Sequence, residues 1–119
     1  MKQFLKSFAF AFSGIAYCFK RERNFYIHIL ASILALGLSF FLSLSSIEFV
    51  IVILCIAAVL TIEMINTAIE QLCNFISRER NPAIGIIKDI SAGAVLVMSL
   101  ASLACGLIIF LPKLLTLLK

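Results

Sequence analysis

The chain of 119 residues is 63% hydrophobic and only 13% charged, and its mean hydropathy is +1.17. Soluble domains are on average about one quarter charged, so this composition excludes an ordinary soluble domain. The net charge of +4 does not indicate nucleic-acid binding, because the basic residues flank apolar segments instead of forming a stripe. We therefore expect a single all-α membrane domain over residues 1–119.

Residues 1–20 predict an amphipathic helix that lies on the membrane surface. Apolar side chains recur there at helical spacing, at Phe4, Phe8, Phe12, Ile15 and Phe19. Lysines and a serine follow another face of the same helix. A helix with one apolar and one basic face lies in the membrane interface and does not cross it.

Three further segments are apolar enough to span a membrane as helices, at residues 25–44, 47–77 and 88–111. A span needs about 20 predominantly apolar residues. A short serine-rich link over 43–46 separates the first two spans. A link over 78–87 contains a proline and a glycine and separates the second span from the third.

The basic residues predict the orientation of these spans. Five precede the first span and three lie between the second and third, whereas the link between the first two has none. Basic residues accumulate on the cytoplasmic side, so the N-terminus and the second link are expected in the cytoplasm. The C-terminal Lys113 and Lys119 then lie outside, which is a mild counter-signal.

A polar stripe inside the second span is the main functional signal. Glu63, Asn66 and Glu70 are three and seven residues apart, which places them on one helix face. Counted from Phe49, Glu63 lies roughly 21 Å into the membrane, while Glu70 reaches the cytoplasmic boundary. Ion pairs that merely hold helices together would need fewer polar residues. Charged groups at this depth are functional candidates by default.

Two other charged clusters are expected to meet this stripe from the cytoplasmic side. Glu22 precedes the first span, and Lys88 with Asp89 opens the third. Each cluster alone is ordinary flanking charge. Together with Glu63 and Glu70 they form a set of acids and a lysine that suits phosphoryl transfer, since acids bind Mg²⁺ and a lysine steadies phosphate charge. The chain lacks a Gly-x-x-x-x-Gly-Lys-Ser/Thr loop, so the nucleotide is not held in that way.

Three segments of this sequence resemble those of a known protein family. The segments Glu22–His28, Glu63–Glu70 and Lys88–Leu96, at matching separations, are similar to the small prokaryotic diacylglycerol kinases and undecaprenol kinases. The resemblance covers nearly the whole chain. It implies a homotrimer of three-span chains, each with an N-terminal surface helix, in the bacterial cytoplasmic membrane. It also implies phosphorylation of a lipid hydroxyl with ATP and Mg²⁺.

The resemblance assigns roles to particular residues. Glu63 would be the general base, supported by Asn66, and Glu22 and Glu70 would bind Mg²⁺. Nucleotide contacts are implied for Phe10, Glu22, Glu70, Glu79, Arg80, Asn81, Lys88 and Asp89. Substrate contacts are assigned to Glu63 and Ala92, although the small residues around Ala92 could instead support trimer packing.

The chain departs from the family pattern at three positions. Asn74 replaces an Asp, Phe10 replaces a Tyr, and Ile87 replaces a small residue. The first change weakens a charge role at Asn74, the second removes a hydroxyl but keeps stacking, and the third could shift helix packing. We expect activity, because none of these changes touches the acids.

The form of the segment Glu22–His28 resembles Gram-positive-type members, so we expect undecaprenol to be preferred over diacylglycerol, whose product would be phosphatidic acid. The alternatives are a small multidrug-type proton-coupled exporter and a non-catalytic membrane subunit. His28 is expected to be an interfacial residue, and Glu48 a solvated charge at the outer end of the second span.

Overall fold

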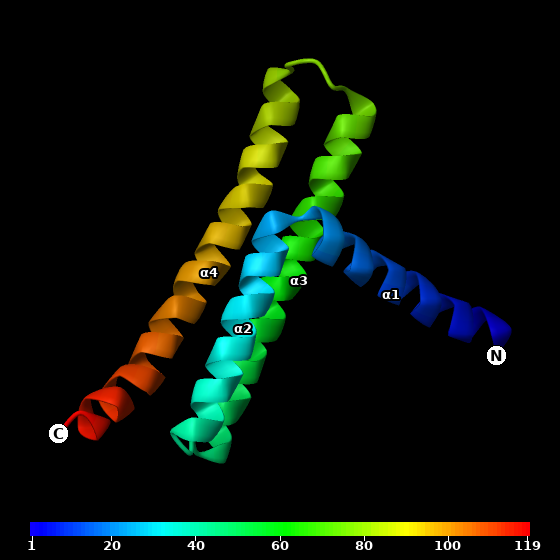
Figure 1. The fold of residues 1–119 in the computed structure, drawn as a ribbon. Coiled ribbons are helices and arrows are strands. Elements are labelled where there is room, and N and C mark those ends of the chain that lie inside the picture. Colours follow the sequence, from blue (N-terminus) through cyan, green and yellow to red (C-terminus); the bar gives the residue numbers. More distant parts are fainter.

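The computed structural model describes all 119 residues and contains four helices and no strands. They are α1 (Lys2–Arg21), α2 (Arg23–Phe41), α3 (Ser46–Ile76) and α4 (Pro82–Leu117). Helices α2, α3 and α4 run beside one another, whereas α1 projects sideways from the start of α2 (Figure 1).

Helices α2, α3 and α4 are long and apolar enough to cross a membrane, as the composition predicts. Only 11 of the 119 residues are buried, and large apolar side chains are exposed along all three helices. So much exposed apolar surface is unfavourable in water and suits a lipid environment. The chain therefore has the surface of a protein that crosses the membrane several times.

The turn between α2 and α3 is shaped by a capping box. The Ser45 hydroxyl accepts a hydrogen bond from the Glu48 backbone N–H at 3.2 Å, and the Ser45 N–H donates to Glu48 Oε1 at 2.9 Å. Such reciprocal bonds satisfy backbone donors that a helix start leaves open. Glu48 also lies 3.4 Å from Lys113 Nζ of α4. Our prediction of a merely solvated charge at Glu48 was thus incomplete.

The link between α3 and α4 is shorter than the predicted 78–87, because α4 already begins at Pro82. The Asn81 side chain caps this helix by accepting a hydrogen bond from the Ala83 N–H at 2.9 Å. Proline is tolerated at the first helical position, where its missing N–H would have no helical partner. Our assignment of Pro82 and Gly85 to the link was therefore wrong.

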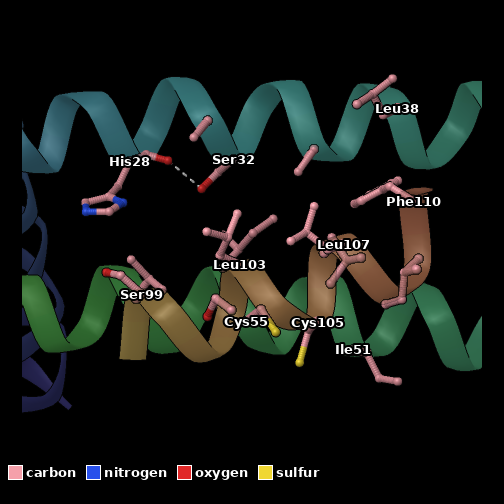
Figure 2. Close-up of a pocket in the computed structure, with 18 residues that line it drawn as sticks. His28, Ser32, Leu38, Ile51, Cys55, Ser99, Leu103, Cys105, Leu107 and Phe110 are labelled. Atoms are coloured by element: carbon pink, nitrogen blue, oxygen red, sulfur yellow. Dashed lines mark hydrogen bonds between the residues drawn. The ribbon is translucent and has the colours of Figure 1, made fainter. Parts of the chain in front are cut away.

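Helix α3 is central, since it packs against α1, α2 and α4, while the backbones of α2 and α4 do not approach each other. A cavity of about 450 Å³ lies between α2, α3 and α4 and is lined mainly by apolar side chains (Figure 2). A small buried core lies at the end of the helices near the α2–α3 turn and consists of Leu44, Val52 and Ile109.

Candidate functional site

Glu63 is buried in the middle of the structure, where α3 faces α2. It is only 3% exposed. The imidazole of His28 on α2 approaches it, with His28 Nε2 3.2 Å from Glu63 Oε1. Our prediction of an interfacial His28 did not include this contact, which arises because α2 packs on α3.

A count from the α2–α3 turn could have found this contact. Phe40 and Phe49 pack across the turn with ring centroids 5.0 Å apart. His28 lies 12 residues before Phe40, and Glu63 lies 14 residues after Phe49. With a rise of 1.5 Å per residue, both are about 20 Å from the aromatic pair. The single histidine of the chain and the deepest acid of the polar stripe thus stand at the same depth of a helical hairpin, which is a sequence signal for their contact.

Glu22 is the residue between α1 and α2, and the structure brings it near Glu63 and Glu70 of α3. Partial burial is the main cause that raises the pKa of the Glu22 carboxyl, followed by the nearby charges of Glu70 and then Glu63. Glu22 joins α1 to α2, and both helices pack on α3, where Cys18 of α1 and Thr67 of α3 are buried. Of the predicted set of acids, Glu22, Glu63 and Glu70 therefore lie near one another, whereas Asp89 is exposed on α4.

Asn66 joins this set to α4. Its side-chain nitrogen Nδ2 donates to Glu70 Oε1 at 3.4 Å, and its Oδ1 accepts a hydrogen bond from the Ser91 hydroxyl at 2.6 Å. Ser91 is buried. The two bonds orient the amide and link α3 with α4. Ser91 belongs to the small residues around Ala92, for which the sequence predicted no hydrogen bond, so this contact was missed.

Lys88 lies beside the same polar face. Its Nζ donates to Asn74 Oδ1 at 2.7 Å. Asn74 is one helical turn beyond Glu70, so this contact holds the lysine close to the acids. Asn74 thus retains a polar contact although it lacks the charge of the family's Asp.

The other predicted site residues are not brought to the acids within one chain. Phe10 is 74% exposed on α1. Asp89 and Ala92 are exposed on α4, and the Asp89 carboxylate makes no hydrogen bond or ion pair. The link between α3 and α4 lies beyond the start of α2 (Figure 1) and carries Glu79, Arg80 and Asn81.

Glu22 and Glu70 suit a Mg²⁺ ion that is also bound by the phosphates of a nucleotide. No three side chains of His, Cys, Asp and Glu come close enough to hold a metal on protein ligands alone. Mg²⁺, however, typically takes one or two carboxylates together with water and substrate phosphates. Glu22 and Glu70 provide two carboxylates. Burial is the main cause that raises the pKa of Glu22, and the charges of Glu70 and Glu63, which a bound cation would offset, add to it.

Comparison with known proteins identifies the family. Residues 9–110 match the family described as prokaryotic diacylglycerol kinase. The chain belongs to this family. It is 40% identical to the undecaprenol kinase of Bacillus subtilis over 114 residues, which is 96% of this chain and 93% of that protein. It is 32% identical to a diacylglycerol kinase of Synechocystis over 114 residues, covering 95% of this chain and 65% of that protein.

A diacylglycerol kinase of Haemophilus influenzae is more distant, with 26% identity over 107 residues, or 89% of this chain and 91% of the relative. As a member of the prokaryotic diacylglycerol kinase family, the chain is a multi-pass membrane protein and an ATP-dependent lipid kinase. The family match disfavours the proton-coupled exporter and the non-catalytic subunit. All the predicted site residues, from Phe10 to Ala92, lie within the matched segment.

Proposed function

We propose that this lipid kinase phosphorylates undecaprenol in the bacterial cytoplasmic membrane, with its N-terminus and its site facing the cytoplasm. The observation that carries the proposal is the buried Glu63, which stands two turns from Glu70 on the same face of α3. One carboxylate is placed for a lipid headgroup and the other for a water-soluble nucleotide. The 40% identity to an undecaprenol kinase supports the choice of lipid.

In the proposed reaction, Glu63 takes the proton of the lipid hydroxyl. A free alcohol is a poor nucleophile, and a positioned base activates it. The alcohol oxygen then bonds to the γ-phosphorus of ATP, the bond from that phosphorus to the bridging oxygen breaks, and ADP leaves. The products are the lipid phosphate, ADP and the proton on Glu63.

The remaining polar residues bind the nucleotide. Glu22 and Glu70 would hold Mg²⁺, which when bound offsets the negative charge of the phosphates. Asn66 keeps Glu70 in place through its 3.4 Å hydrogen bond. Lys88 of α4 is held by Asn74, one turn beyond Glu70 on α3, and would contribute a positive charge for the phosphates.

We propose a homotrimer because a single chain leaves the site incomplete. Asp89, Ala92 and the link residues Glu79–Asn81 are exposed, and no hydrogen bond or ion pair joins them to Glu22, Glu63 or Glu70. The apolar faces of the spanning helices are also uncovered. Neighbouring chains would cover these faces and could bring nucleotide-binding residues to an acid set that is not their own.

We also propose that α1 lies in the membrane interface. Phe4, Phe8 and Phe12 are exposed along it, and the helix points away from the spanning helices (Figure 1). Burying these rings at the level of the headgroups would stabilise the bound position of the helix and keep Phe10 near the membrane surface.

Undecaprenol should be the better substrate when both alcohols are compared. We expect kcat/KM for undecaprenol to exceed that for diacylglycerol, measured in the same mixed micelles at a fixed concentration of Mg-ATP. ATP hydrolysis without lipid gives the background. A ratio that favours diacylglycerol would overturn the choice of lipid and leave the kinase mechanism intact, because both lipids present a primary hydroxyl.

The orientation can be tested with single cysteines in a background whose four native cysteines are replaced by alanine. Ser46→Cys lies at the α2–α3 turn and leaves the capping residue Ser45 intact, whereas Ser77→Cys lies at the end of α3. In right-side-out vesicles, an impermeant thiol reagent should label the first variant and spare the second. Labelling of Ser77→Cys alone would reverse the proposed topology.

A further inference from the structure

The contact between His28 and Glu63 has no assigned role in phosphate transfer. His28 Nε2 lies 3.2 Å from Glu63 Oε1, and neither oxygen of this carboxylate has another hydrogen-bond or ion-pair partner. The carboxylate is almost completely buried. Without His28 it would have no polar partner in the chain, and its orientation would not be defined by any hydrogen bond.

His28 also lies at one end of the cavity between α2, α3 and α4, near the serines Ser32 and Ser99 (Figure 2). The imidazole projects from α2 towards the other helices, at the end of the cavity opposite Leu38 and Phe110 (Figure 2). The His28 side chain is 28% exposed. His28 therefore lines the cavity and also contacts Glu63, whose own side chain is 4% exposed and does not line the cavity.

We propose that His28 is a positioning residue for phosphate transfer, which holds Glu63 Oε1 so that Oε2 faces the lipid hydroxyl. This inference rests on the proposed role of Glu63 as the base. An ionised carboxylate only accepts hydrogen bonds, so the hydrogen in this contact belongs to Nε2 of His28. Oε1 is still an acceptor after Oε2 has taken the proton from the alcohol. The same contact therefore persists from the start to the end of the proton transfer.

The inference can be tested by removing the donor and then restoring it in another side chain. His28→Leu removes the hydrogen bond, and we expect it to lower kcat for lipid phosphorylation by about 10- to 100-fold, since misplacing a reacting group by about 1 Å can cost that much. His28→Gln places an amide N–H near the position of Nε2 and should keep kcat within about fivefold of the wild type. KM for Mg-ATP should change by less than about twofold in both variants, because His28 contacts Glu63 and forms no ion pair with Glu22 or Glu70.

Controls separate positioning from folding. Ile27→Leu, at the neighbouring exposed position of α2, should retain the wild-type kcat. Thermal melting and gel filtration in detergent report whether each variant folds, and His28→Met replaces the leucine variant if that one does not. In a Glu63→Gln background, loss of His28 should cause no further fall in activity, because a residue that acts through Glu63 has no effect once the base is gone.

Three outcomes would overturn the inference. An unchanged kcat in folded His28→Leu would show that Glu63 needs no positioning. A glutamine variant as inactive as the leucine variant would show that the imidazole itself is required, as expected if His28 takes the proton. A further loss in the Glu63→Gln background would show that His28 acts independently of Glu63. A wild-type protein without lipid kinase activity would instead refute the proposed function.

Discussion

Glu63→Gln should leave the protein folded and able to bind Mg-ATP while it lowers kcat for lipid phosphorylation by at least about a hundredfold. General-base catalysis typically contributes 10² to 10⁴ in rate, and a neutral amide cannot take the proton from the alcohol. The amide has nearly the volume of the carboxyl group, and its oxygen can still accept the hydrogen bond from His28. The side chain therefore still fits its buried position.

The matched control is Glu48→Gln, the same substitution on the same helix at the α2–α3 turn. Glutamine is compatible with the capping box at Ser45, so the start of α3 should be preserved. We expect wild-type kcat in this variant. The measurements are the initial rate of lipid phosphate formation and the affinity for Mg-ATP. Activity of Glu63→Gln within about tenfold of the wild type would contradict the assignment of Glu63 as the base.

Glu22→Gln and Glu70→Gln should each abolish the Mg²⁺-dependent binding of ATP. Both variants remove one of the two carboxylates proposed to hold the ion, and Mg²⁺ sites in nucleotide enzymes seldom have more than two protein carboxylates. Isothermal titration of ATP with and without Mg²⁺ measures the effect directly. Glu48→Gln again serves as the control, because Glu48 lies at the opposite end of α3.

The melting temperatures of the Glu22→Gln and Glu70→Gln variants provide a second test of the metal site. The pKa of Glu22 is raised in the folded protein, so its ionised form near neutral pH is unfavourable to folding. Without Mg²⁺, Glu22→Gln should therefore melt at a slightly higher temperature than the wild type, and Mg-ATP should no longer stabilise it. Mg-ATP binding that is unchanged in both variants would assign these acids a purely structural role.

Much of the architecture follows from local properties of the chain. Each spanning segment is defined by its own run of apolar residues, and no partner is needed to recognise it. The stripe of Glu63, Asn66 and Glu70 is likewise a local feature, because the helical period alone puts these residues on one face. Local patterns were less reliable at the helix ends. Pro82 suggested a link, yet it occupies the first turn of α4 under the Asn81 cap.

The contacts around the stripe depend on how the helices pack. His28 meets Glu63, Ser91 meets Asn66, and Lys88 meets Asn74, each pair coming from two different helices. Glu22 approaches Glu70 because it joins α1 to α2 and both of these helices pack on α3. The apolar surfaces of two membrane helices are compatible with several registers and rotations. The sequence by itself therefore determined which polar residues stand at membrane depth, whereas tertiary packing decided which of them touch, because the register between helices is set by the fit of all their side chains together.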